Sequence, residues 1–293
     1  MRIDIERPNG RVASPTELAE ALTYITPGFT EEVFDSYYVS DHPVANDFGL
    51  AESYEKAAGL MPEPSEGKQG VALIVGNGGF ETAVRFLPSE TPIIICDMSA
   101  SNLFTQRVIL ETIRNCPTVA GFQEAIEQFG EDFIGLRSKG TPEMPEFDSL
   151  DVRYEDQETR WNHGVIPYFL HSEQAYDAAR NDLLQQAIGF REINLRDVED
   201  RDALAADLTA QNAEVTLLNA TNVFAVGWAG PDSGIGLATR LPFNTHAMVM
   251  DSNGGNLESQ VHKIEAWKAY HNLRIKRAHM GQAMATLAIE GNP

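Results

Sequence analysis

The sequence has only two cysteines, Cys96 and Cys116, among its 293 residues. Two thiols are too few for a disulfide framework or a zinc cluster, so we expect neither. No stretch approaches the roughly 18–20 uncharged apolar residues that cross a bilayer, so we expect no membrane span. The N-terminus alternates apolar and charged residues without an apolar segment, which argues against a cleavable secretory signal, although a secretion route without one stays open. The two cysteines fit the reducing cytoplasm, where we expect the protein.

Positive charge is also scarce: 22 lysines and arginines face 43 aspartates and glutamates, and the formal net charge is −21. Such a surface repels phosphate backbones, so we expect a small-molecule substrate and no nucleic acid. The motifs G-x-S-x-G and H-E-x-x-H are absent, as is the Gly-Lys-Ser/Thr ending of a P-loop. Asp41-His42 and Asp251 lack the spacing of metal ligands, so we expect no metal site.

Hydrophobic residues make up 43% of the chain, which is enough for a substantial core. Continuous apolar runs at 71–75 and 92–96 are typical of strands buried on both faces, as in parallel sheets. Helical patterns follow them at 81–87 and 101–115, and this order predicts β-α-β units with right-handed crossovers. Further strands are predicted at 190–195, 214–218 and 246–250, with helices at 172–188, 200–208 and 257–285.

We therefore predict an α/β fold with a doubly wound, mostly parallel Rossmann-like sheet. A helical N-terminal lead-in spans residues 1–67 and either packs on the core domain or covers its site as a lid. The run Ser14-Pro15-Thr16-Glu17 predicts a helix start in it, with Ser as the cap, Pro at the first position and Glu at the third. The core domain spans 68–293 and carries a polar, irregular insertion at 117–170, after the second strand–helix unit. Residues 227–244 are predicted to form a loop rich in glycine and proline.

Glycines follow the first predicted strand directly, in the run Gly76-Asn77-Gly78-Gly79. Glycine at such a place lets the main chain turn tightly and approach a ligand closely. Asp97 lies twenty-one positions after Gly76, at the end of the second predicted strand. An acid there can accept hydrogen bonds from both hydroxyls of a ribose. Strand, glycines, helix, strand and acid in this order predict a site for an adenosine-type cofactor.

The position of Glu81 helps to choose among such cofactors. In the dinucleotide motif G-x-G-x-x-G counted from Gly76, Glu81 occupies the place of the third glycine. A carboxylate there packs poorly against a strand and faces the pyrophosphate, which disfavours NAD and FAD. S-adenosylmethionine carries no phosphate but has a sulfonium and an ammonium group, with which nearby acids are compatible.

The run Gly76-Asn77-Gly78, followed by Asp97, resembles the first two motifs of the class I S-adenosylmethionine-dependent methyltransferases. Phe80 stands where the last glycine of that family's first motif is usual. The resemblance covers about residues 70–250 and implies a Rossmann-like fold with S-adenosylmethionine as cofactor. It further implies a set of cofactor-binding residues: Gly76, Asn77, Gly78 and Gly79 at the turn, Asp97 on the ribose, Met98 on the adenine ring, and Asp197 on the adenine amino group.

The stretch 217–224 resembles the fourth-strand motif of the same family, whose exit lines the reaction centre. This makes Asn219 a candidate for cofactor binding and for catalysis, and Asn222 a catalytic candidate, because ligands bind outside the carboxyl ends of parallel strands. His163, in the insertion, is a candidate general base, which is needed only if the nucleophile carries a proton of high pKa. The ordinary alternatives are a turn residue for Asn222 and a surface residue for His163.

A fainter resemblance concerns the betaine-lipid synthase branch of this superfamily, which transfers the aminocarboxypropyl group instead of the methyl group. It involves the run 168–172, Asp197 and the run 219–223. The sequence thus predicts an S-adenosylmethionine-dependent transferase, most simply a methyltransferase, that acts on a small molecule. Two alternatives remain open on the same fold: an NAD(P)-dependent oxidoreductase, and a non-catalytic binding protein.

Overall fold

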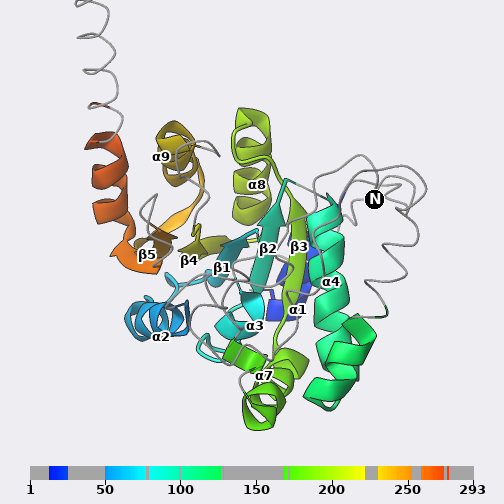
Figure 1. Ribbon diagram of the computed structural model, residues 1–293. Coiled ribbons are helices and arrows are strands. Elements are labelled where there is room, and N and C mark those ends of the chain that lie inside the picture. Colours follow the sequence, from blue (N-terminus) through cyan, green and yellow to red (C-terminus); the bar gives the residue numbers. More distant parts are fainter. Residues whose placement is uncertain are drawn as a thin grey trace, which may run out of the picture.

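The computed structural model describes residues 13–25, 50–76, 79–98, 100–126, 128, 168–170, 172–221, 230–252, 259–273 and 276. A six-stranded sheet with the order β3-β2-β1-β4-β5-β6 forms its centre (Figure 1). The strands are β1 (Gln69–Val75), β2 (Ile93–Asp97), β3 (Ile188–Glu192), β4 (Ala213–Asn219), β5 (Phe243–Ser252) and β6 (Ser259–Lys263). The first five run parallel, and β6 pairs antiparallel with β5. The predicted α/β class with a mostly parallel sheet is therefore confirmed.

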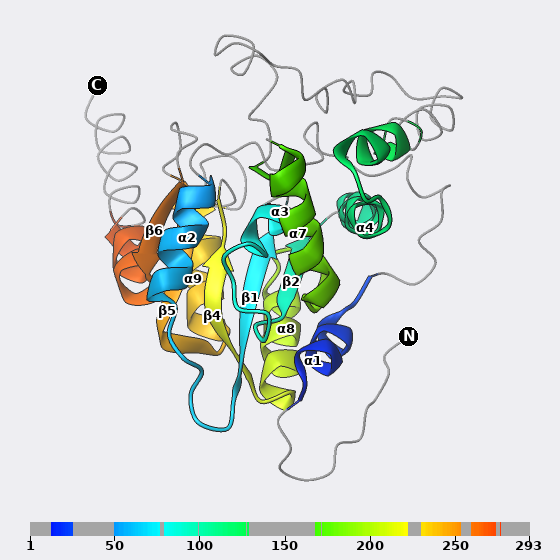
Figure 2. The same cartoon turned by 90° about the horizontal axis from the view of Figure 1, so that it is seen from below.

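Helices lie on both sides of this sheet, with α8 and α9 on one side and α2, α3 and α7 on the other (Figures 1 and 2). The described helices are α1 (Pro15–Leu22), α2 (Leu50–Leu60), α3 (Phe80–Ala83), α4 (Ala100–Asn115), the 3-10 turn η3 (Tyr168–Leu170), α7 (Glu173–Gln185), α8 (Val198–Ala210), α9 (Gly230–Arg240), and two helical segments at 119–126 and 264–273. None of them has both the length and the apolar composition that a bilayer crossing needs.

Each face of the sheet has its own apolar core. Successive strand residues point to opposite faces, so Ile74 belongs to one core and Leu73 to the other. The first core joins α2, α3, α4 and α7 to the sheet, and the second joins α1, α8, α9 and the segment 264–273. Burial on both faces explains why the central strands read as continuous apolar runs.

The first helix, α1, packs tightly against β3. It begins with the predicted capping box, in which Ser14 and Glu17 exchange hydrogen bonds between side chain and main chain. After the helix, Tyr24 forms a one-residue parallel bridge with Arg191 and so covers the outer edge of the sheet. The closest approach is at Gly189, where a Cβ atom would lie 2.5 Å from the carbonyl oxygen of Ala19 and 2.8 Å from Oγ1 of Thr23.

The close contact between α1 and Gly189 predicts that Gly189→Ala destabilises the protein. The added methyl group meets main chain that cannot rotate away, so we expect a loss of about 1–3 kcal/mol in the free energy of unfolding. Gly59→Ala in α2 is the matched control, because nothing described lies within 4 Å of its Cβ position, and it should leave stability unchanged or raise it by about 0.5–1 kcal/mol. Urea unfolding measures both; equal stability of the two variants would contradict the close contact.

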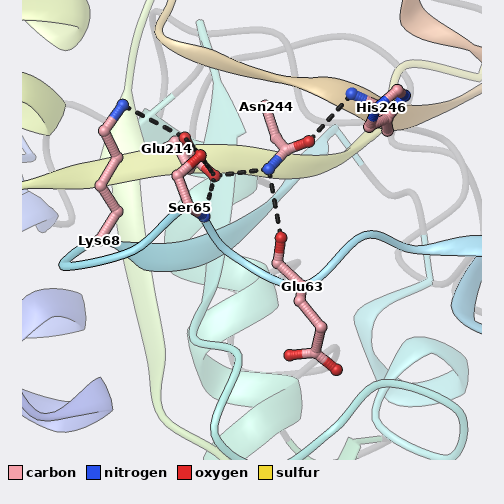
Figure 3. A network of polar contacts seen from close by, with 6 residues as sticks. All are labelled: Glu63, Ser65, Lys68, Glu214, Asn244 and His246. Atoms are coloured by element: carbon pink, nitrogen blue, oxygen red, sulfur yellow. Dashed lines mark hydrogen bonds and ion pairs between the residues drawn. The ribbon is translucent and has the colours of Figure 1, made fainter.

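Residues 61–68 link α2 to β1. They are attached to the amino end of the sheet through Glu214, near the start of β4 (Figure 3). This carboxylate is 2% exposed and accepts hydrogen bonds from the amide and hydroxyl of Ser65 and from Nδ2 of Asn244 at 2.6 Å. Lys68 lies 3.2 Å away as the counter-charge. Burial alone raises the pKa of Glu214, but these hydrogen bonds outweigh it and hold the pKa below its ordinary value of 4.5.

Because the pKa of Glu214 is lowered in the folded protein, the stability difference between wild type and Glu214→Gln should depend on pH. At neutral pH we expect this variant to lose about 1.5–3 kcal/mol, because the network loses its negative charge and one of its two acceptor oxygens becomes a donor. The ionised carboxylate stabilises the fold fully above pH 4.5, and that contribution disappears as the pH falls through the lowered folded-state pKa. The stability gap between wild type and variant should therefore stay constant from pH 7 to pH 5 and narrow below that, in urea unfolding at each pH. A gap that is constant down to pH 3 would contradict this account.

The structure corrects four predicted elements. The third strand ends at Glu192 rather than 195, because the chain leaves the sheet after the Ile193 amide bonds to the Asp97 carbonyl. The predicted loop 227–244 contains α9, whose glycines are poor helix formers but whose apolar face is buried in the second core. The helix predicted from 257 starts only at 264, after the edge strand β6, whose pairing with β5 is a non-local contact. The first helix after β1, predicted at 81–87, is the short α3.

One further segment differs in detail from the predictions. The insertion is not irregular throughout, because the segment 119–126 is helical and buries Phe122 and Ile126 in the first core.

The last described helix is fixed to the end of β5 by Asp251, whose Oδ2 accepts from Nε1 of Trp267 at 2.8 Å and lies 3.2 Å from Nε2 of His271. Asp251 therefore has a structural role in joining this helix to the sheet.

Candidate functional site

The parallel strands end together at one edge of the sheet. From β1 the chain continues to β2 and β3 on one side, and then returns to β4 on the other side of β1. Such a reversal of strand order opens a crevice outside the carboxyl ends of the two central strands, where open α/β sheets bind their ligands. Four residues stand at this place on neighbouring strands, in the order Glu192, Asp97, Gly76 and Asn219. We call them the strand-end row.

The side chains of the strand-end row share one face of the sheet. Each stands two positions after a residue of the first core, namely Phe190, Ile95, Ile74 and Leu217. Because side chains two apart in a strand point to the same face, Glu192, Asp97 and Asn219 point to the side that carries α2 and α4. The carboxylates of Asp97 and Glu192 are half-buried there, whereas Asn219 is fully buried.

Gly76 and Asp97 lie together, as the sequence predicts. Gly76 has a φ of 65°, in the left-handed region that favours glycine, and its amide donates to the carbonyl of Cys96 at 2.7 Å. A Cβ atom at Gly76 would lie 3.8 Å from Oδ2 of Asp97. Gly79 is also left-handed, with a φ of 72°, and begins α3. The turn between β1 and α3 therefore starts and ends in conformations that glycine adopts most readily.

The surroundings of Asp97 suit a group that is to contact a ligand. Its carboxylate is half-buried, and Oδ2 accepts a hydrogen bond from Nδ2 of Asn102 at 3.3 Å. Met98, the next residue, is 61% exposed, which is unusual for a large apolar side chain. The sequence motif singled out Asp97 and Met98; it did not point to Asn102.

Glu192 was missed by the sequence analysis. It is the direct ladder partner of Asp97 and closes β3, because that strand ends three residues before the predicted end. Asp197, to which the resemblance assigns the adenine amino group, is exposed and begins α8, where its Oδ1 accepts from the amide of Glu199 at 2.8 Å. The described contact of Asp197 is thus that of a helix cap, and the acid at the end of β3 is Glu192.

Glu81 takes up an unusual position for a carboxylate. It is 1% exposed, in α3 directly after the glycine turn, and its neighbour Phe80 packs in the first core. The place of the third glycine of a dinucleotide motif is therefore occupied by a buried acid. Glu81 therefore does not offer the close helix–strand packing that glycine gives at this place of a dinucleotide site.

Asn219 is fully buried and joined to two other segments. Its Nδ2 donates to the phenolic oxygen of Tyr54 at 2.7 Å, across from β4 to α2. Its Oδ1 accepts from the amide of Thr221 at 3.1 Å and also from the Thr221 hydroxyl. The observed contacts give Asn219 a role in holding the exit of β4; its contact with a cofactor or substrate stays a prediction. Tyr54 packs against the sheet rather than standing over it as an open lid.

Four of the proposed site residues lie outside the described part of the chain: Asn77, Gly78, His163 and Asn222. Among the described residues, no group of three or more His, Cys, Asp or Glu side chains could hold a metal ion. Cys96 lies next to Asp97 but is 1% exposed, and burial raises its thiol pKa to about 12 against the opposing charge of Arg191, which disfavours a nucleophilic thiolate.

Comparison with known proteins adds no assignment. No family model matches the sequence, and no curated protein matches it. The function is therefore argued from the strand-end row itself.

The bond between Tyr54 and Asn219 predicts a measurable stability effect. Tyr54→Phe removes an acceptor inside the core and leaves the Asn219 amide hydrogen without that partner, so we expect a loss of about 1–3 kcal/mol in the free energy of unfolding. Tyr270→Phe is the matched control, because Tyr270 is 42% exposed, and it should change stability by less than about 0.5 kcal/mol. If chemical denaturation finds the two variants alike, the bond does not hold α2 to β4.

Proposed function

We propose that this protein is an S-adenosylmethionine-dependent transferase, most simply a methyltransferase, that acts on a small molecule. The observation that carries the proposal is that the carboxylate of Asp97 lies beside the left-handed turn at Gly76, 3.8 Å from where a Cβ atom would stand. It lies at the carboxyl edge of the sheet, where the strand order reverses. Helices on both faces and this reversal support a doubly wound, Rossmann-like arrangement.

The residues of the strand-end row fit the chemical groups of the cofactor. The Asp97 carboxylate offers acceptors for ribose hydroxyls, and Gly76 keeps side-chain atoms out of the space beside it. Met98 offers an exposed thioether surface on which an adenine ring can pack. Glu192, on the neighbouring strand, offers an acceptor for the adenine amino group and is an alternative to Asp197 in that role.

The local charge supports this cofactor over a dinucleotide. Asp97 and Glu192 make the region acidic, and the chain as a whole carries a net charge of −21. A sulfonium and an ammonium group are attracted by this environment, whereas two phosphates are repelled. The oxidoreductase alternative requires NAD or NADP, whose phosphates are repelled by this environment. The non-catalytic alternative differs from the proposed enzyme only in its lack of turnover.

Transfer from this cofactor places modest demands on the protein. The sulfonium makes the adjoining carbon electrophilic, so the protein mainly needs to align acceptor and donor in line. The exit of β4, fixed by Asn219 and Thr221, flanks the turn at Gly76 and is the proposed wall of the acceptor side. Asn222 and His163 keep their proposed catalytic roles, with His163 as base for an acceptor that must lose a proton.

Calorimetry with S-adenosylhomocysteine tests the proposal. We expect wild type to bind, and Asp97→Ala to bind about 10- to 100-fold more weakly, because hydrogen bonds to a charged carboxylate are lost. Asp202→Ala is the matched control: this aspartate is exposed on α8 and pairs with Arg240, so its loss should leave affinity unchanged.

Two outcomes contradict the proposal. Wild type that fails to bind S-adenosylhomocysteine removes it outright. Thermal stabilisation by NAD or NADP, without stabilisation by the sulfur nucleoside, replaces it with the oxidoreductase alternative.

A further inference from the structure

The main chain around Asp97 is fixed on both sides. The carbonyl of Asp97 accepts from the amide of Ile193 at 2.7 Å, and the carbonyl of Cys96 accepts from the amide of Gly76 at the same distance. The freedom that remains is rotation of the Asp97 side chain among its staggered rotamers. A ligand that needs the carboxylate beside Gly76 gains affinity from any contact that selects this rotamer in advance.

Asn102 makes such a contact. Its Nδ2 donates to Oδ2 of Asp97 at 3.3 Å, and this same oxygen is the atom 3.8 Å from the Cβ position at Gly76. Asn102 is half-buried in the first turn of α4, a helix of 16 residues that packs on β2 and β3 within the first core. The donor is therefore carried by a rigid element rather than by a loop.

The carboxylate of Glu192 explains why a hydrogen bond from Asn102 to Asp97 matters. Glu192 faces Asp97 across the parallel ladder, where strands are about 4.8 Å apart, and like charges directly opposite each other repel. Repulsion turns the Asp97 carboxylate away from its place beside Gly76, whereas the hydrogen bond from Asn102 holds it there. A neutral amide supplies that bond without neutralising the charge that a ligand is to use.

We infer that Asn102 is a positioning residue: its side-chain amide holds the Asp97 carboxylate beside Gly76, ready for the hydroxyls of a nucleoside. The inference rests on the proposed function, because it names the ribose of an adenosine-type cofactor as the ligand of Asp97. Asn102 itself needs no contact with the ligand and acts through Asp97.

Calorimetry with S-adenosylhomocysteine on Asn102→Ala tests the inference. We expect binding about 3- to 10-fold weaker than in wild type, the effect of losing one orienting hydrogen bond. Asn115→Ala is the matched control, since Asn115 is the same residue type at the other end of α4 and donates to the Glu111 carbonyl at 2.8 Å. Its affinity should equal that of wild type. Asn102→Ser, which keeps a shorter donor, repeats the comparison should the alanine variant not fold.

Two further readouts separate positioning from general support of the fold. In the Asp97→Ala background, Asn102→Ala should weaken binding no further, because the group through which it acts is gone. Asn102→Asp should bind more weakly than Asn102→Ala, because a carboxylate in place of the amide repels Asp97 instead of donating to it.

The outcomes are distinguishable. Wild type that binds, together with an Asn102→Ala variant that binds equally well, overturns the inference and leaves the proposed function intact. An additional loss in the Asp97→Ala background also overturns it, because Asn102 then acts independently of Asp97. Wild type that does not bind the sulfur nucleoside overturns both.

Discussion

The left-handed conformation of Gly76 is the constraint on which the site depends. A residue with a Cβ atom is disfavoured there by roughly 1–2 kcal/mol. The turn lets β1 leave the sheet one residue after Val75 while the Gly76 amide still bonds to β2. Since β1 lies where the strand order reverses, this turn opens the edge of the sheet beside the carboxylate of Asp97. Every role proposed for the neighbouring side chains follows from that opening.

The segment that precedes β1 supports this edge from a distance. The fourth strand is held at both ends by side chains from this segment: Ser65 and Lys68 contact Glu214 at its amino end, and Tyr54 contacts Asn219 at its carboxyl end. On the outer side, α1 fixes β3 through the close approach at Gly189. Residues that read as a helical lead-in therefore define the position of the strands whose ends carry the site. Buried polar bonds of this kind specify one arrangement, because leaving either partner unsatisfied is costly.

The sequence was informative where the physical signal is local. Continuous apolar runs identified β1 and β2, the glycines and Asp97 identified the turn, and Ser14 with Glu17 identified the start of α1. The missed features depend on contacts between distant segments. The end of β3 is set by its ladder with β2, so Glu192 could not be recognised. The helix α9 overcomes its glycines by packing on α8, with Gly236 against Arg201, and β6 exists only as a partner of β5.

Charge at the strand-end row is the remaining argument about the ligand. A carboxylate and a phosphate about 6 Å apart repel by roughly 3 kcal/mol at the effective dielectric constant of such sites, and an ammonium or sulfonium at that distance is attracted equally. An acid at the place of Asp97 also binds the ribose in dinucleotide sites, so the charge that discriminates is that of Glu192 on the adjacent strand. Dinucleotide sites of this architecture have glycine where this chain has Glu81, which allows the helix to pack closely on the strand. In the proposed function, Glu192 repels a phosphate and attracts a cationic nucleoside, and Asn102 donates to Asp97 without neutralising its charge.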